Sequence, residues 1–189
     1  EEAQDIDRVL NIFIRVNSAG TVLSYSDLLL SIATAQWETT DAREAVYGLV
    51  DELNAFGKGF SFSKDLILKA GLVLSDVNDI GFKVSNFNAS NMRKLEENWA
   101  GIARSLRVAV QLLADFGFSE INLRAHSVLI PLAYYVHRRG LSDQYLRAAA
   151  FARDRSEVRS WVIRSLIKAG VWGSGLDTLL TALRAVLRE

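Results

Sequence analysis

The sequence contains no cysteine, and only one proline and twelve glycines occur among its 189 residues. The absence of cysteine excludes disulfides, thiolate zinc sites, iron–sulfur ligation and a cysteine nucleophile. The scarcity of proline and glycine argues against disorder and against turn-rich β architectures. No run of 18 consecutive apolar residues occurs, so we expect no membrane span and no membrane partner. With no recognisable signal peptide, these features predict a soluble, cytoplasmic protein.

What the sequence does contain is apolar material arranged with helical periodicity. Half of the residues are hydrophobic, and apolar positions recur at spacings of three and four almost throughout. This pattern predicts an all-α fold, an irregular multi-helix bundle of about eight or nine helices. The length suits a single helical domain over residues 1–189. Turn residues between 78 and 89 mark the best place for a subdomain break, dividing 1–77 from 90–189.

Several helix starts can be assigned from capping residues. A first helix is expected from Ile6 to about Asn17. Ser24 with Asp27 three residues later forms a capping-box pattern, and Asp41 and Ser63 precede the next two apolar runs. The run after Ser24 is apolar on nearly every side, which is typical of a helix buried in the middle of a domain.

The longest helix is expected from Ser90 to about Phe116. Apolar residues follow an unbroken spacing of three and four along it, and we interpret this seam as the spine of a bundle rather than a homodimeric coiled coil. The seam consists of Met92, Leu95, Trp99, Ile102, Leu106, Ala109, Leu113 and Phe116.

Four further helices are expected in the C-terminal part of the chain. The first runs from about 124 to 139, where Pro131 should kink the helix or delay its start. Two more are predicted at 141–151 and 157–169. Gly170, Gly173 and Gly175 then break the chain, and an amphipathic helix follows Asp177. Val84 and its neighbours suggest at most a short extended piece.

The charge is zero overall but unevenly distributed. Residues 1–92 hold 7 Lys or Arg and 13 Asp or Glu, whereas residues 93–189 hold 15 and 9. Such an imbalance could steer an anionic partner to the C-terminal half, or the two halves could simply attract each other. Five arginines cluster around the aromatic Tyr145 and Trp161, and arginine beside aromatics suits phosphate contact and base stacking. They are Arg147, Arg153, Arg155, Arg159 and Arg164.

Internal ion pairing is the alternative for this cluster, because Asp143, Asp154 and Glu157 lie in the same stretch. The two histidines, His126 and His137, would lie roughly 16 Å apart on one helix, too far to share a metal ion. We therefore expect no catalytic residue, no metal site and no cofactor in this chain.

The segment from Ile12 to Leu28 resembles a known family. It matches the pattern Ile-Phe-x-Arg-x-Asn-x-x-Gly-x-x-Leu-Ser-x-x-(Asp or Glu)-Leu of the GmrSD-type restriction-endonuclease N-terminal domain family, formerly a domain of unknown function. The matching positions nearest that family's active region are Asn17, Gly20, Thr21 and Ser24. A second, weaker likeness runs from Val158 through Trp161 to Asp177, and the two span nearly the whole chain.

The resemblance implies an active region outside this sequence. Members of the family begin with a ParB/sulfiredoxin-like region that carries an Asp-Gly-Gln-Gln-Arg motif linked to nucleotide hydrolysis and phosphodiester cleavage. That motif is absent here, the chain starts at Glu1, and its only methionine is Met92. We therefore expect a fragment of a longer protein, which as a whole would be an NTP-dependent nuclease.

Two hypotheses follow for the function of the chain. The first is a helical accessory or scaffold region of a GmrSD-like restriction or anti-phage defence protein. It would support the upstream ParB-like region of the same protein, which is its expected partner, and contact DNA through residues 147–164. The alternative is a helical protein–protein interaction module with no nucleic-acid role, using the Met92–Phe116 seam or the last helix.

Overall fold

The computed structural model describes residues 24–173 and 175–188. Within them the chain is all-α, with eight α-helices, three short 3-10 turns and no strand, so the predicted helical bundle is confirmed. The helix expected from Ile6 to Asn17 lies outside the described residues. The α-helices are α2 (Tyr25–Gln36), α3 (Ala42–Asn54), α4 (Lys64–Leu74), α5 (Ala89–Asp115), α6 (Leu129–Arg138), α7 (Asp143–Arg147), α8 (Ala152–Ile167) and α9 (Leu176–Arg188).

The first three helices begin at the capping residues that the sequence indicates. The Ser24 hydroxyl accepts a hydrogen bond from the Asp27 amide at 3.2 Å, and the Asp27 carboxylate accepts one from the Ser24 amide at 3.1 Å. This reciprocal pair is the predicted capping box. Asp41 and Ser63 cap α3 and α4 by accepting from amides two or three residues on. Because each cap satisfies amides that lack an intrahelical partner, the starts are defined locally.

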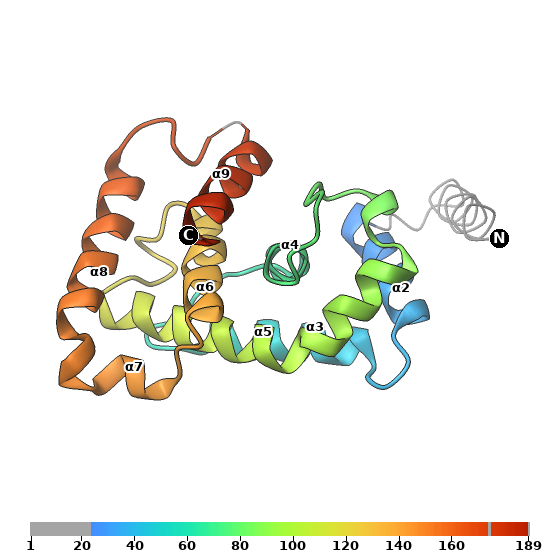
Figure 1. The fold of residues 1–189 in the computed structure, drawn as a ribbon, viewed down its shortest axis with the longest axis horizontal. Coiled ribbons are helices and arrows are strands. Elements are labelled where there is room, and N and C mark those ends of the chain that lie inside the picture. The colour runs from blue at the N-terminus through green and yellow to red at the C-terminus, as the bar shows by residue number, and fades with distance from the viewer. Residues whose placement is uncertain (1–23, 174, 189) are drawn as a thin grey trace.

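Helix α5 is the spine of the fold, as predicted. It begins at Ala89 rather than Ser90, because the Asn88 side chain accepts from the Asn91 amide and caps it. Figure 1 shows α5 running along nearly the whole molecule, with α2 and α3 at one end and α6 to α9 at the other. Six seam residues are completely buried, namely Met92, Leu95, Ile102, Leu106, Ala109 and Leu113.

The buried surface of α5 is wider than that seam. Val108, Val110 and Leu112 are also buried, so α5 is covered on more than one side, by α4 and α6 among others. Trp99 is half-buried and packs edge to face on Trp37, with ring centroids 5.2 Å apart. The seam is therefore enclosed by the chain's own helices.

Pro131 delays the start of α6, one of the two effects expected of it. A 3-10 turn at His126–Val128 precedes the helix, and Pro131 is the third residue of α6. The first-turn amides of a helix have no intrahelical acceptor, so a proline there breaks no hydrogen bond. The two histidines consequently belong to different elements instead of sharing one helix.

The helices predicted at 141–151 and 157–169 are wrong in their bounds. The chain forms only the short α7, becomes extended at Ala148, makes a 3-10 turn at Ala149–Phe151 and enters α8 at Ala152. A physical reason is visible at the end of α7. The Arg155 side chain donates to the carbonyls of Tyr145 and Ala148, which takes acceptors that a longer helix would use.

The segment between α4 and α5, where the sequence suggests a subdomain break, contains a 3-10 turn at Val84–Asn86 instead of an extended piece. Its backbone is held from both sides. The buried Arg184 of α9 donates to the carbonyls of Val77 and Asn78, and Gln36 of α2 donates to the carbonyl of Phe87. A single hydrophobic cluster extends across this segment.

Helix α9 docks through polar anchors as well as apolar contacts. Lys69 of α4, itself buried, pairs with Asp177 and donates to the Ile80 carbonyl. Near the other end of α9, Arg188 donates to the Asp76 carboxylate at 2.6 Å and to the Tyr134 hydroxyl at 3.0 Å. The pair of Asp76 with Arg188 joins an acid of the first half of the chain to a cation of the second half, so part of the charge imbalance is satisfied internally.

None of the described helices combines the length and the apolarity that crossing a bilayer requires.

Glu96 of α5 fastens the loop between α2 and α3. Its carboxylate accepts from the backbone amides of Glu38, Thr39 and Thr40 and from the Thr39 hydroxyl, at 2.7 to 3.1 Å. The Glu38 amide has the largest effect on the pKa of Glu96, and together with the donors of Thr39 and Thr40 it lowers that pKa to about 2. Such hydrogen bonds favour the ionised carboxylate.

Replacing Glu96 by Ala should therefore lower the free energy of unfolding by about 1 kcal/mol at neutral pH, a modest value because the site is exposed. Folding lowers the pKa of Glu96 below its ordinary value of 4.5. The stabilisation is therefore fully present above pH 4.5 and disappears as the pH falls towards 2. Urea titrations across this range, with Glu97→Ala as the matched control, measure the effect. If the difference in the free energy of unfolding between Glu96→Ala and the parent chain stays constant as the pH falls to about 2, this account is wrong.

Candidate nucleic-acid interface

Helix α8 is held in place by the carboxylate of Asp154, which lies in its first turn. The hydroxyl of Tyr135, from α6, donates to both oxygens of Asp154 at 2.7 and 2.8 Å. The hydroxyl of Tyr145, from α7, donates at 2.6 Å, and Arg139 adds an ion pair at 3.2 Å. One carboxylate thus joins three helices, and its partners come from positions 9 to 19 residues away.

This network shifts the pKa of each of its members. Burial alone raises the pKa of Asp154, but the hydrogen bonds from Tyr145 and Tyr135 and the charge of Arg139 outweigh it, and the pKa is lowered. Burial and the Asp154 carboxylate raise the pKa of Tyr135 to about 12. The same two causes also raise the pKa of Tyr145 above its ordinary value. Asp154 therefore stays ionised and both tyrosines stay protonated at neutral pH, so the junction persists.

Arg155 completes the junction between α7 and α8. Its guanidinium donates to the carbonyl of Tyr145 at 2.6 Å and to that of Ala148 at 2.9 Å. The side chain is half-buried. Although Arg155 and Arg159 are one helical turn apart, Arg155 is turned back towards α7 whereas Arg159 is exposed. The two arginines therefore have different environments.

The remaining members of the arginine cluster are exposed on α7 and α8. Arg153 pairs with Glu157 at 3.1 Å, but the two side chains are 93% and 66% exposed, so the pair contributes little. Within residues 24–173 and 175–188, no ion pair involves Arg147, Arg159, Arg164 or the nearby Lys168. Internal pairing thus accounts for only part of the cluster.

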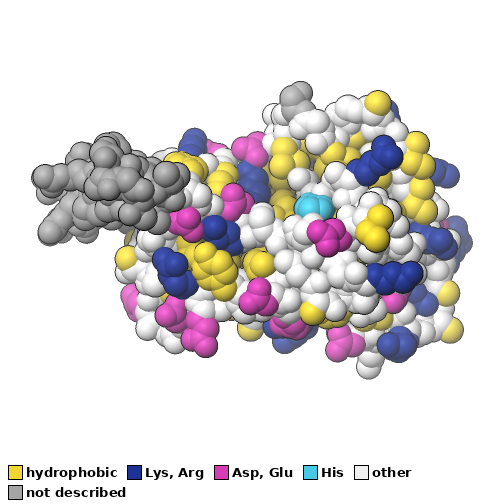
Figure 2. Space-filling model, turned by 180° about the vertical axis from the view of Figure 1, so that it is seen from behind, with side chains coloured by type: hydrophobic (Ala, Val, Ile, Leu, Met, Phe, Trp, Pro, Cys, Tyr) yellow, Lys and Arg dark blue, Asp and Glu magenta, His cyan; other side chains and the backbone are white. Residues whose placement is uncertain are grey.

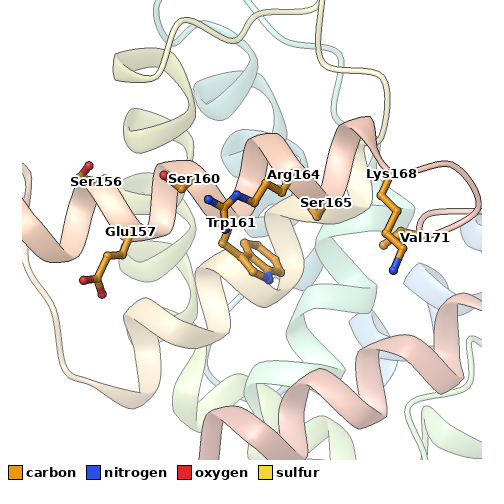
Figure 3. Close-up of a pocket in the computed structure, with 8 residues that line it drawn as sticks. All are labelled: Ser156, Glu157, Ser160, Trp161, Arg164, Ser165, Lys168 and Val171. Carbon is orange, nitrogen blue, oxygen red and sulfur yellow. The ribbon is translucent and has the colours of Figure 1, made fainter.

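A shallow groove of about 520 Å³ runs along the exposed face of α8. Trp161 and Lys168 project from the same side of the helix, and Arg164 runs back along the helix towards Trp161 (Figure 3). Cations and hydroxyls with an exposed aromatic edge can accept a phosphodiester backbone. The groove is lined by Ser156, Glu157, Ser160, Trp161, Arg164, Ser165, Lys168 and Val171.

A second concavity, of about 330 Å³, lies on the other side of Trp161. Residues of α6, α8 and α9 line it, and we call it the apolar cleft. Asp154 and Glu157 are its only acidic lining residues, and Tyr135 and Trp161 are its aromatic ones. Its apolar lining comes from Pro131, Leu132, Val158, Leu183, Val186 and Leu187.

Positive charge gathers at the same end of the molecule. Figure 2, turned by 180° from Figure 1, shows Lys and Arg side chains gathered on its right-hand side, which corresponds to the side of α8 in Figure 1. Eight Lys or Arg and three Asp or Glu occur between residues 138 and 168. The side of α8 therefore presents a positive surface to an anionic partner.

Other candidates from the sequence are placed as follows. Asn17, Gly20 and Thr21 of the family-like motif lie outside the described residues, whereas Ser24 is the N-cap of α2. The ring of His126 packs edge to face on Phe62. The described residues contain no group of three or more His, Asp or Glu side chains placed to hold a metal ion.

His137 makes a contact that the sequence did not indicate. Its Nδ1 lies 3.1 Å from the Ser105 hydroxyl, which also donates to the Gly101 carbonyl at 2.8 Å. Burial lowers the pKa of His137, so the ring is neutral at physiological pH. Ser105 is only 4% exposed, which makes this pair a contact between α5 and α6 and leaves the hydroxyl inaccessible to a substrate.

Comparison of the sequence with protein-family models and with curated proteins finds no match.

The two arginines 155 and 159 should differ in their effect on stability. Arg155→Gln leaves two half-buried carbonyls without their charged donor, so we expect it to lower the free energy of unfolding by about 1–2 kcal/mol. Arg159→Gln changes an exposed side chain and should stay within about 0.5 kcal/mol of the parent. Urea denaturation followed by circular dichroism measures both. Equal losses in the two variants would show that Arg155 does not hold the α7–α8 junction.

Proposed function

We propose that this chain is the helical bracing region of a GmrSD-like restriction or anti-phage defence protein, and that the exposed face of α8 contacts DNA. The likeness of residues 12–28 to that family supports the first part. The second part rests on one observation: Arg164 and Lys168 line a groove beside Trp161, and no described acidic side chain pairs with them.

The bracing role is supported by the way the family-like motif enters the fold. The motif ends in the first turn of α2, where the capping box of Ser24 and Asp27 sets the direction of the chain. Three consecutive leucines, Leu28 to Leu30, are then almost fully buried. A region that precedes α2 in the chain would thus be followed by a helix that is firmly packed in the core. Nucleotide hydrolysis and strand cleavage would belong to the upstream ParB-like region.

The DNA contact is expected to be electrostatic and independent of sequence. Exposed arginine and lysine side chains bind phosphates, and such contacts position the duplex without reading its bases. Arg147, Arg153, Arg159 and Arg164 are available for this purpose. Arg155 is excluded from the proposed contact surface because its donors are engaged with backbone carbonyls.

Removing two phosphate-binding cations should weaken duplex binding and its dependence on salt. For Arg159→Gln combined with Arg164→Gln, we expect the slope of log affinity against log salt to fall in magnitude by about 2. Fluorescence anisotropy titrations with a labelled duplex at graded salt measure this slope. The matched control is Arg93→Gln combined with Lys94→Gln, which removes two exposed cations from the far end of α5 and should leave the slope unchanged. Identical slopes for both double variants would refute the α8 contact.

A protein–protein interaction module is the second candidate, and the apolar cleft favours it. The Met92–Phe116 seam is not available to a partner because the helices of the chain enclose it. The last helix is available in part, since Val186 at the edge of the apolar cleft is 67% exposed. Apolar surface beside polar residues is typical of protein-binding sites.

A further inference from the structure

Trp161 separates two concave surfaces of opposite chemical character. Its ring lines both the shallow groove along α8 that holds Arg164 and Lys168, which we call the cationic groove, and the apolar cleft between α6, α8 and α9. The ring is 36% exposed and is supported from one side by Trp172, whose centroid lies 6.4 Å away at 86°. A partly exposed indole that lines both the cationic groove and the apolar cleft is suited to a ligand that has a charged part and a flat apolar part.

The charged part of such a ligand must be an anion that enters from the Arg164 and Lys168 side. At the opposite end of α8, Asp154 lines the apolar cleft and Glu157 lines both concavities. Asp154 is ionised, and its tyrosine and arginine partners belong to the protein. The carboxylates of Asp154 and Glu157 disfavour an anion in the apolar cleft, whereas Arg164 and Lys168 attract one in the groove along α8. The charged part of the ligand is therefore expected in that groove and not in the apolar cleft.

The flat part of the ligand fits the apolar cleft. A volume of about 330 Å³ falls at the lower end of the range for small-ligand sites. Trp161 lines it together with aliphatic side chains of α9, among them Leu183 and Val186. Aromatic platforms of this kind bind nucleobases by stacking, without sequence preference. A base inside a duplex has both faces covered by its neighbours, so only an unpaired base can enter.

We propose that the ligand of this surface is a single-stranded or locally unpaired segment of nucleic acid. Its phosphates lie on Arg164 and Lys168, and one base enters the apolar cleft against Trp161. This inference rests on the proposed DNA contact and narrows it, because it predicts a preference for unpaired strands. Duplex DNA uses only the cationic groove.

The test compares an oligothymidine of about 15 nucleotides with a duplex whose ends are closed by hairpins, each titrated by fluorescence anisotropy. We expect Trp161→Leu to weaken single-strand binding about tenfold and to leave duplex binding unchanged. Trp161→Phe, which keeps a ring, should retain most of the affinity. Arg164→Gln combined with Lys168→Gln should weaken the binding of both ligands. For the single strand, the slope of log affinity against log salt should fall in magnitude by about 0.7 per cation.

A second variant guards against loss of packing in Trp161→Leu. Val186 is exposed at the edge of the apolar cleft, so Val186→Asp should leave the fold intact, as a thermal melt would verify. It should weaken single-strand binding selectively, because a carboxylate then faces the strand at the cleft mouth. Arg93→Gln combined with Lys94→Gln again serves as the control.

The outcomes separate this inference from the proposed function. One outcome is that the cation variants weaken duplex binding, while Trp161→Leu and Val186→Asp change the affinities for both ligands equally or not at all. In that case the single-strand inference fails and the proposed DNA contact stands. If the parent chain binds neither ligand, both fail. A dimer in light scattering that Val186→Asp converts to a monomer would show that the apolar cleft is a protein interface, and would overturn the inference.

Discussion

A 27-residue helix that is apolar over more than one face has to be covered on several sides, and this requirement organises the whole fold. The residues Val108, Val110 and Leu112 extend the buried surface of α5 beyond its seam. Helices from both halves of the sequence therefore pack around it, with α4 and α6 contacting each other as well. Once α5 is enclosed, α8 remains at the margin, with Val162 as its only buried residue. A helix in that position is free to carry polar contacts.

Polar interactions determine how α8 lies. A helix with one buried residue gains little from hydrophobic burial. The orientation of α8 is therefore determined by the Asp154 carboxylate and the Arg155 guanidinium. Both act across the α7–α8 junction, one through tyrosine hydroxyls and the other through backbone carbonyls. They anchor the first turn of α8 to α6 and α7, whereas Arg164 in the last turn and Lys168 at the C-cap are exposed to solvent. The proposed contact surface thus belongs to a helix that two polar side chains hold at its N-terminal end.

Sequence reasoning succeeded where structure is determined locally and failed where distant residues decide. Ser24, Asp41 and Ser63 cap helices through amides two or three residues away, so the pattern alone located them. The end of α7 depends on a side chain seven to ten residues further along, which no periodicity indicates. The same limit applies to the arginine cluster, because no spacing in the sequence indicates that Arg155 donates to the backbone carbonyls of Tyr145 and Ala148. The apolar cleft, built by three helices, had no signal in the sequence.

All four tryptophans of the chain occur in two edge-to-face pairs. Trp37 and Trp99 meet where α2 reaches α5, and Trp161 and Trp172 meet where α8 leads into the loop before α9. Indoles this close couple their electronic transitions, and the coupling depends steeply on separation and mutual angle. Each pair should therefore contribute its own exciton signal to the circular dichroism of the protein, beside the signals of the helices and of the other aromatic residues. Local rearrangement of either side would be visible spectroscopically, without any added label.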